Sequence, residues 1–363
     1  MSIRYGGWIY IFCFSLVSGL AQQNGPAGQS GPPASVPPGS ASRQMTLDVV
    51  VTDKSGKPVS GLEQKDFTLL DNKLPQKIVS FQAVAGAAAT ADPPVEVVLL
   101  MDGVNTEFTN VAIERNEMVK FLGRNGGALA QPTSLLFFSS SGATQTISSR
   151  DGNAVVADLN QKQIGLRAIG RAQGFYGGIE RMQMSLSALQ KFADFEAAVP
   201  GRKLLVWISP GWPYLVSGMD QVLISQRQKQ ELFNSIVALS DALRRARITL
   251  YNIDPLGTAD AGGLRVTDYK QFLKGVKTAR QADNGNLALQ VLASQSGGLV
   301  LNSSNDLAGE MATCVADASG FYVLSFDSLP GDGPNEYHAL DVKLDKPGLT
   351  ARTRSGYYAQ PER

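Results

Sequence analysis

Between residues 93 and 317, short apolar segments alternate with longer amphipathic segments. The apolar segments lack an alternation of polar and apolar residues, which is typical of parallel strands buried on both faces. They are 95–102, 133–141, 201–211, 247–255 and 298–304. The segments between them have helical spacing, as in the stripe of Ile179, Met182, Leu186, Leu189 and Phe192. Alternating strands and helices require helices on both faces of the sheet, so this region is predicted to be a doubly wound α/β domain with a mostly parallel sheet.

Both ends of the chain carry a different pattern, in which polar and apolar residues alternate within short segments. These are 45–53 and 66–84 before the α/β region, and 318–328, 337–345 and 349–358 after it. The alternation indicates antiparallel strands with one buried face. Two or three such strands rarely form a stable unit alone. We therefore expect one small β-sandwich built from residues 44–92 and 318–360, with residues 93–317 inserted; two separate β-units are the alternative.

The first 21 residues have the features of a signal peptide. Arg4 precedes an apolar run from Trp8 to Leu20, and the small residues Gly19 and Ala21 suit a cleavage site. Residues 22–43 are rich in Pro and Gly without apolar periodicity, which predicts a disordered linker. The mature protein is expected to be secreted or periplasmic and without a transmembrane segment. A retained N-terminal anchor is the alternative.

Charge and residue types restrict the classes of function. The chain has 33 Lys and Arg against 32 Asp and Glu, which argues against a protein built to hold nucleic acid. It has one histidine and two cysteines, so zinc chemistry lacks its usual ligands. Signal cleavage removes Cys13, and Cys314 is then expected to be a small buried hydrophobe. His338, the only histidine, is expected to be exposed or in an edge strand. A binding or structural protein is favoured over an enzyme.

The carboxyl ends of the predicted parallel strands are where a ligand is expected in this type of sheet. Asp102 closes the first strand, and Asn105 and Thr106 follow it. Ser209 follows the third strand and Asp254 the fourth. Carboxylate and hydroxyl oxygens of this kind suit Mg²⁺. An acid at the start of a helix is also stabilised by backbone N–H groups alone, without any metal.

Four segments give the chain a resemblance to a known family: VVLLMDGVNT, GRKLLVWISPGW, VVVTDKSGKPVSGLEQKDFTLLDN and KPGLTARTRSGYYA. The central region resembles a von Willebrand factor type A (VWA) domain. The chain from about Thr46 to Ala359 resembles the secreted VWFA-related proteins described from Acidobacteria. This resemblance implies a Rossmann-like domain beside an immunoglobulin-like β-part. It also implies a metal-ion-dependent adhesion site, at which a partner's carboxylate completes the shell of a divalent cation.

The resemblance carries over to the proposed metal site only in part. Asp102 matches the family's first aspartate and Thr106 its last hydroxyl, whereas Val104 stands at a serine position. Asn105 is adjacent and offers an oxygen, and Ser209 stands where the family has an acid. We therefore expect a degenerate site formed by Asp102, Asn105 and Thr106, with Mg²⁺ bound weakly or not at all.

The loop after the third strand carries the expected partner-binding residues Ser209, Trp212 and Tyr214. Trp and Tyr are enriched at binding hot spots; the alternative is that they pack over the sheet. The preferred function is an exported, non-catalytic protein of the adhesion type, which binds a protein partner on the cell envelope or outside the cell. The alternatives are a cell-envelope hydrolase that uses Asp102 and Asp254, and a purely structural envelope protein.

Overall fold

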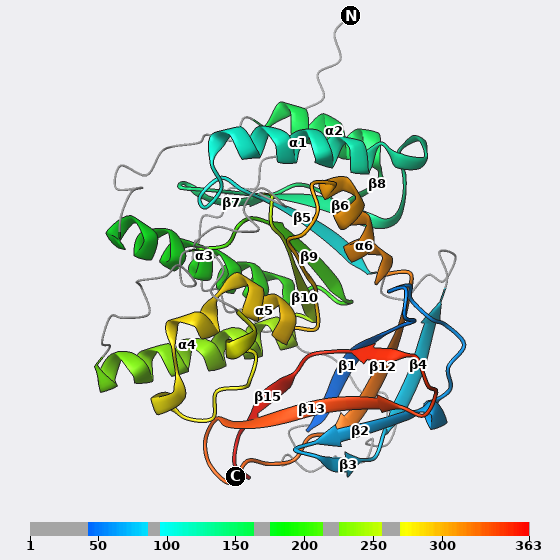
Figure 1. Cartoon of the computed structure of the whole chain (residues 1–363), viewed down its shortest axis with the longest axis vertical. Coiled ribbons are helices and arrows are strands. Elements are labelled where there is room, and N and C mark those ends of the chain that lie inside the picture. The colour runs from blue at the N-terminus through cyan, green and yellow to red at the C-terminus, as the bar shows by residue number, and fades with distance from the viewer. Residues whose placement is uncertain (1–42, 86–94, 163–174, 213–224, 256–268, 363) are drawn as a thin grey trace, which may run out of the picture. The chain divides into compact units, whose positions relative to one another are not determined.

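The computed structural model describes residues 43–85, 95–162, 175–212, 225–255 and 269–362. The expected signal peptide and nearly all of the expected linker lie outside these residues. The described chain is a mixed α/β structure with one mostly parallel sheet and two antiparallel sheets (Figure 1).

Seven described strands form the largest sheet, in the order β11-β10-β9-β5-β6-β7, with β8 also paired to β6. The parallel strands are β5 (Glu96–Asp102), β6 (Ala128–Ser139), β9 (Lys203–Ile208), β10 (Ile248–Ile253) and β11 (Val300–Leu301). Every residue of β9 and β10 is buried, which explains why their sequences lack alternation. The order of the strands reverses at β5, because the chain goes from β5 to β6 on one side and returns to β9 on the other.

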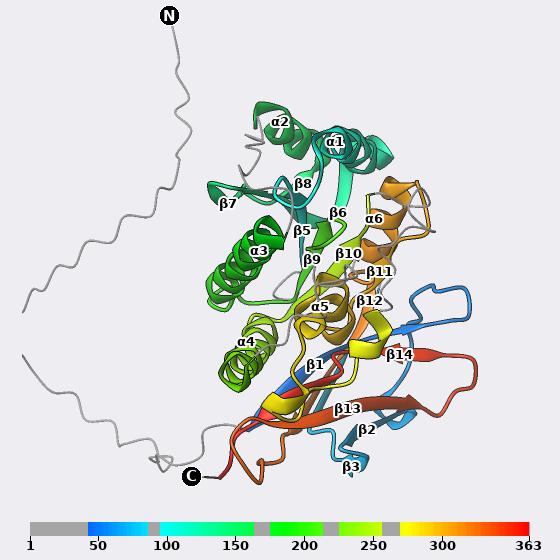
Figure 2. The same cartoon turned by 60° about the vertical axis from the view of Figure 1, so that its left-hand side comes forward.

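Helices cover both faces of this sheet, as the alternating pattern predicts (Figures 1 and 2). One face carries α1 (Phe108–Leu122), α2 (Gly152–Gln161) and α6 (Leu307–Ala316), and the other carries α3 (Phe175–Glu196), α4 (Gln226–Arg245) and α5 (Leu289–Gln295). Successive residues of β5 supply the two cores in turn. Val97, Leu99 and Met101 face α1 and α6, whereas Val98 and Leu100 face α3 and α4. Cys314 of α6 is fully buried in the first of these cores, as expected.

One edge of the sheet departs from strict alternation of strand and helix. After β6 the chain forms β7 (Gly142–Gln145) and β8 (Ser149–Asp151), and both pair antiparallel with β6. These short, polar strands were not predicted, because their residues are mostly exposed and lack an apolar periodicity. The edge of the sheet is therefore an antiparallel ribbon.

The two smaller sheets each combine strands from both ends of the described chain. One has the order β14-β1-β12-β4 and the other β15-β13-β2-β3. The strands are β1 (Gln44–Thr52), β2 (Phe67–Asp71), β3 (Leu74–Gln76), β4 (Ser80–Ala85), β12 (Gly320–Asp327), β13 (Glu336–Leu344), β14 (Thr350–Arg352) and β15 (Gly356–Ala359). Leu47 and Leu324 of one sheet share a hydrophobic cluster with Leu69 and Val342 of the other. The sheets thus bury their apolar faces against each other.

The segment 349–358, expected as one strand, forms β14 and β15, which lie in different sheets. Between them, residues 353–355 bond to other parts of the chain. Thr353 Oγ1 donates to Asp48 O at 2.8 Å, and Ser355 N donates to Gln295 O at 3.0 Å. This second bond joins the β-sheets to the end of α5. The α/β region and the β-sheets are therefore connected by specific bonds as well as by the chain.

Candidate functional site

The carboxyl ends of the parallel strands meet at one edge of the large sheet, which we call the rim. The described loops at the rim are 103–107 after β5, 140–141 after β6, 209–212 after β9, 254–255 after β10 and 302–306 after β11. Because β5 and β9 are neighbours at the reversal of strand order, Asp102 and Ser209 lie on adjacent strands. The structure therefore brings these two predicted residues to the expected edge of the sheet.

Asp102 is fully buried, and its carboxylate accepts four hydrogen bonds from the protein. Oδ1 accepts from the backbone N–H groups of Val104 at 2.8 Å and Asn105 at 2.9 Å. Oδ2 accepts from Asn105 Nδ2 at 2.8 Å and from Trp207 Nε1 at 2.9 Å. An ionised carboxylate has about four acceptor positions, so all of them are filled. Asp102 thereby holds the rim loop against β9.

Asn105 and Thr106 occupy the same loop but have different contacts. Asn105 Nδ2 also donates to Ser185 Oγ of α3 at 2.9 Å, so its side chain connects Asp102 to the helix. Asn105 Oδ1 is buried and has no hydrogen-bond partner among the described residues. Thr106 Oγ1 is also buried, and it lies close enough to the Glu114 carboxyl group to lower the pKa of that acid, without a hydrogen bond of standard geometry. Asn105 Oδ1 is thus the oxygen of the predicted metal site for which the described residues offer no partner.

The arrangement around Asp102 does not fit a divalent cation in this conformation. A cation is held by free lone pairs of ionised carboxylates, whereas both oxygens of Asp102 face N–H donors. Within the described ranges, no group of three or more His, Cys, Asp or Glu side chains is placed to hold a metal ion. Binding of Mg²⁺ by Asp102, Asn105 and Thr106 stays a prediction, and it requires the Asp102 hydrogen bonds to rearrange.

Ser209 and Trp212, two of the expected partner-binding residues, are buried. Ser209 is fully buried, and its Oγ accepts from Gly211 N at 3.0 Å. Trp212 is 3% exposed, donates from Nε1 to Leu287 O at 2.9 Å and packs edge-on against Trp207 at 5.5 Å between ring centroids. The packing alternative therefore describes Trp212 in this structure, because its indole fills the core below the rim. Tyr214 lies outside the described residues.

Glu114 is a buried acid beside the rim that sequence reasoning missed. It lies on α1 among Val111 and Met118 and is fully buried. The polar group beside its carboxyl oxygens is Thr106, which does not reach standard hydrogen-bond geometry. Burial raises the pKa of Glu114 well above its ordinary value, and the negative charges of Asp102 and Asp254 raise it further. Burial thus favours the uncharged form of this carboxyl group. The sequence feature that could have revealed Glu114 is the presence of an acid within the apolar stripe of α1.

A second buried acid, Glu310, lies on α6, which is next to α1 on the same face of the sheet (Figure 1). Its side chain is only 8% exposed, and burial together with the charges of Asp254 and Asp306 raises its pKa to about 7. Glu310 therefore titrates near neutral pH. The two helices on this face bring carboxyl groups with raised pKa values towards Asp254, at the end of β10.

The exposed part of the rim lies at the start of α1. Phe108 is the first residue of α1 and is 72% exposed, one of seven large apolar side chains that are exposed among the described residues. Glu107 precedes it and is exposed, and its side chain makes no capping hydrogen bond although it occupies the N-cap. Both side chains are therefore directed to solvent from a loop that the Asp102 hydrogen bonds hold in place.

The environment of His338 differs from the expectation. His338 is 4% exposed and lies on β13, which has neighbours on both sides. Its Nδ1 lies 2.9 Å from Asp71 Oδ1, and Tyr357 donates from its hydroxyl to Asp71 Oδ2 at 2.6 Å. The expectation of an exposed histidine was wrong, because Asp71 offers a buried partner from β2, 267 positions away. At His338 itself, β13 pairs with β15 alone, since its pairing with β2 begins at Leu340. This cluster lies inside the β-sandwich and away from the rim.

Comparisons with known proteins were made for the sequence and for the structure. No protein-family model and no curated protein matches the chain. Among solved structures, an aerotolerance-related membrane protein from Bacteroides fragilis matches with a TM-score of 0.34 and 12% identity, over 62% of this chain and 98% of that one.

Two further structures match at similar levels. Proximal thread matrix protein 1 of the mussel byssus has a TM-score of 0.31 and 14% identity, over 68% of this chain and 49% of that one. The pilus adhesin SpaC from Lactobacillus rhamnosus has a TM-score of 0.36 and 9% identity, over 84% of this chain and 43% of that one. Scores at this level assign no function.

None of the helices among the described residues is both long enough and apolar enough to cross a bilayer.

Proposed function

We propose that this chain is an exported, non-catalytic binding protein that holds a protein partner at the rim of its α/β domain. The observation that carries the proposal is the exposed pair Glu107 and Phe108 at the start of α1, directly after a loop held by the buried carboxylate of Asp102. Phe is enriched at protein interfaces, and a contact residue on a held loop loses little freedom on binding. The partner is therefore expected to offer an apolar pocket for Phe108 with a basic group beside it for Glu107.

The role of Asp102 in this proposal differs from that in a metal-dependent adhesion site. Here the carboxylate organises the loop through four protein donors and does not reach the partner. The same contacts oppose the hydrolase alternative, because a general acid or base must exchange a proton with its substrate and Asp102 is fully buried. Binding by the exposed rim is thus the function that the geometry supports best.

A pair of variants on α1 tests the proposal. Envelope extract is passed over immobilised wild-type protein, Phe108→Ser and Ile113→Ser. Ile113 is the matched control, since it is an apolar residue of the same helix that is 50% exposed but lies more than one turn from the rim. A partner protein that is captured by the wild type and Ile113→Ser, and lost with Phe108→Ser at an unchanged melting temperature, supports the proposal.

Two results would count against it. One is equal capture by all three proteins, which would place the contact elsewhere. The other is a large loss of stability in Phe108→Ser, which would give Phe108 a packing role. Trp212→Ala is a useful contrast, because removing a buried Trp should cost about 3–5 kcal/mol of stability.

A further inference from the structure

A groove of about 900 Å³ lies between the β-sandwich and the segment 269–287 of the α/β region. One wall is formed by the β2–β3 turn with Asn72 and Lys73, and by Tyr337 and Ala339 of β13. The opposite wall is formed by residues 271–277, together with three residues from 281–286. In Figure 1 this segment is yellow and lies beside β13. The volume is in the range of a ligand site.

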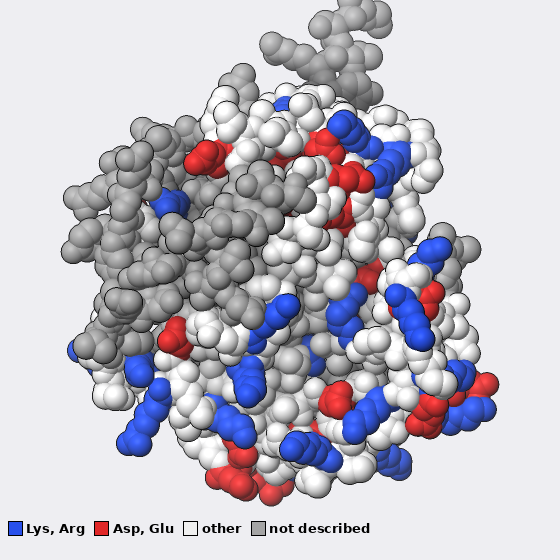
Figure 3. Space-filling view, in the orientation of Figure 1, with Lys and Arg blue, Asp and Glu red and all other residues white. Residues whose placement is uncertain are grey.

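Lysines from both walls line this groove. Lys73 comes from the β2–β3 turn, and Lys274 and Lys277 come from the opposite wall. All three are exposed, and none has a carboxylate partner in the part of the chain that the structure describes. Figure 3 shows many Lys and Arg side chains over the lower part of this face, with Asp and Glu side chains among them. The groove therefore offers unpaired positive charge.

The two acids in the lining are already engaged by the protein. Asp283 Oδ1 accepts from Gly285 N at 3.0 Å, and Glu336 Oε2 accepts from Asp332 N at 2.5 Å. Neither forms an ion pair with the lysines of the groove. Both acids keep their charge, so three lysines against two acids leave the lining with a formal charge of +1 and with lysines that lack a carboxylate partner.

The turn that carries Lys73 holds it in an unfavourable backbone conformation. Asn72 and Lys73 have φ angles of 48° and 70°, and Gly is the residue usually found at such a second position. Asn72 fastens the turn to β13, because its N–H donates to Ala339 O at 2.8 Å and its Oδ1 accepts from Ala339 N at 3.0 Å. A strained position with a charged side chain at a groove points to a use for that charge.

The same turn leaves part of the edge of β13 without a neighbouring strand. Leu340 N donates towards the β15 side, to Ser355 O, whereas Ala339 N points to the β2 side, to Asn72. Tyr337 has the same orientation as Ala339, since backbone groups alternate along a strand. Its N–H and C=O therefore point past the turn into the groove, with no partner for either among the described residues.

The aromatic rings of the groove are engaged within the protein. A Cβ atom added at Gly275 would lie 2.0 Å from atoms of the Tyr337 ring, and one at Gly285 would lie 2.5 Å from the Phe272 ring. Each ring thus has a glycine packed directly against it. A ligand held by ring stacking needs an open aromatic face, so backbone pairing and charge are the interactions that this groove offers.

We propose that the groove binds an acidic peptide segment in extended conformation, which adds as a short strand along β13 beyond the β2–β3 turn. The backbone of Tyr337 pairs with the peptide, and Lys73, Lys274 and Lys277 contact its carboxylates. This is strand addition, in which main-chain bonds supply affinity and flanking side chains supply selectivity.

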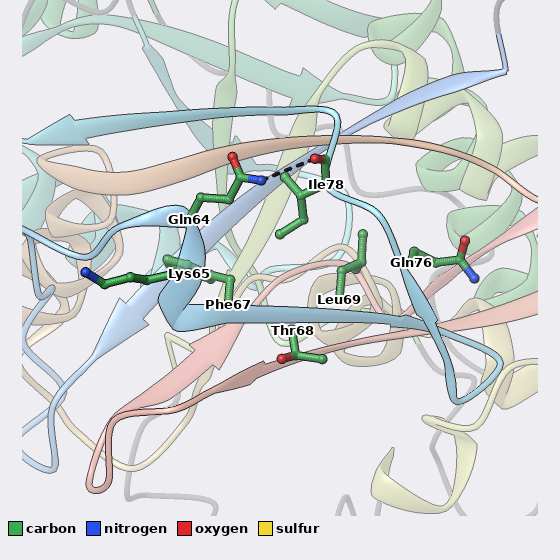
Figure 4. Close-up of a pocket in the computed structure, with 7 residues that line it drawn as sticks. All are labelled: Gln64, Lys65, Phe67, Thr68, Leu69, Gln76 and Ile78. Atoms are coloured by element: carbon green, nitrogen blue, oxygen red, sulfur yellow. Dashed lines mark hydrogen bonds between the residues drawn. The ribbon is translucent and has the colours of Figure 1, made fainter.

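A hollow of about 500 Å³ beside β2 provides a contrast (Figure 4). It lies where β3 ends at Gln76, next to Phe67 and Thr68. Gln64 closes it by donating to Ile78 O at 3.3 Å, and Lys65, its only lysine among the described residues, pairs with Glu63 at 2.7 Å. Without unpaired positive charge, this hollow is not expected to select an acidic peptide.

Fluorescence anisotropy with a labelled ten-residue polyglutamate peptide and the full-length protein tests the proposal at about 50 mM salt. Lys274→Glu/Lys277→Glu and Ala339→Trp should each weaken binding at least tenfold, by charge reversal and by filling the groove. Lys343→Glu is the matched control, because Lys343 is exposed on β13 but does not line the groove; its affinity should stay within twofold. Melting curves check that the variants remain folded.

A second peptide, N-methylated at alternate amides, keeps its charge but cannot pair as a strand, and should bind at least tenfold more weakly. Equal binding of both peptides would overturn strand addition. An equal loss of affinity in Lys343→Glu would show diffuse charge attraction in place of a site. Absence of polyglutamate binding, or tighter binding of oligogalacturonate, would overturn the acidic peptide as the ligand.

Discussion

The indole Nε1 of Trp207 donates a 2.9 Å hydrogen bond to Oδ2 of Asp102, within a fully buried pair on neighbouring strands. The bond joins the end of β5 to β9 at the point where strand order reverses. Together with the three bonds from Val104 and Asn105, it gives the carboxylate four protein donors. Asp102 thus holds the rim loop to the neighbouring strand, and its replacement should mainly reduce the stability of the protein.

A double-mutant cycle measures this bond. Asp102→Asn and Trp207→Phe should each destabilise the protein, and their coupling energy should be about 1.5–3 kcal/mol, as for a hydrogen bond to a charged group. Urea unfolding provides the measurement. Asp102→Asn combined with Trp212→Phe is the control, because Trp212 donates to Leu287 O and not to Asp102. A coupling below about 0.5 kcal/mol in the first pair would show that the bond contributes little.

Addition of Mg²⁺ tests whether the rim rearranges to hold a cation. Since both oxygens of Asp102 are filled, 5 mM MgCl₂ should shift the melting temperature by less than about 1 °C. A cation present at about 100 times its dissociation constant would add about 2.7 kcal/mol of stability and produce a clear upward shift. NaCl at the same ionic strength is the control. A shift specific to Mg²⁺ would establish the metal site that the family resemblance implies.

Glu310 should make the stability of the protein fall as the pH rises through neutrality. Its pKa is about 7 in the folded chain against an ordinary 4.5, so the folded state binds this proton more tightly than the unfolded state does. The stabilisation is complete below about pH 4.5 and is lost as the pH rises through about 7. Glu310→Gln keeps a neutral side chain at every pH. Its melting temperature should match the wild type at pH 4.5 and exceed it by about 3 °C at pH 8; a constant difference would contradict this assignment.

The buried cluster of His338, Asp71 and Tyr357 should be important for the stability of the β-sandwich. His338→Phe removes the partner of Asp71 Oδ1 and should cost about 2–4 kcal/mol in a urea titration, since a buried acceptor is left unpaired. Glu336→Gln serves for comparison, because Glu336 Oε1 lies 4.0 Å from His338 Nε2, beyond hydrogen-bond distance. It should change stability by less than about 0.5 kcal/mol. Similar losses in both variants would argue against a specific contribution from the His338–Asp71 contact.

Several features of the fold were predicted from sequence because they depend on local periodicity. The apolar runs that become β5, β9 and β10 are buried on both faces, and the stripe from Ile179 to Phe192 lies within α3. The exposed ribbon of β7 and β8 was missed, because short polar strands have no apolar pattern to detect. The split of 349–358 was missed as well, since alternation indicates a strand but not the sheet to which it pairs.

The position of the candidate site was predictable from the sequence, but the burial and the contacts of its side chains were not. Asp102 and Ser209 lie on adjacent strands at the expected edge, because strand ends in a doubly wound sheet meet there. Trp212 was expected as a candidate contact residue, yet it packs against Trp207. Phe108 and Glu114 were overlooked: an exposed Phe and a buried Glu each contradict the ordinary preference of the residue type. Such exceptions depend on surroundings that a single sequence does not contain.

By itself, the sequence of this protein determined where most of the strands and helices form and that acids stand at the strand ends, because apolar spacing acts over a few residues. Only the tertiary structure decided that both oxygens of Asp102 accept hydrogen bonds from the protein, that His338 has a buried partner and that the groove beside Tyr337 is open. The physical reason is distance along the chain: Trp207 lies 105 positions from Asp102, and Asp71 lies 267 positions from His338. Whether a polar group is free or satisfied is decided by such remote partners.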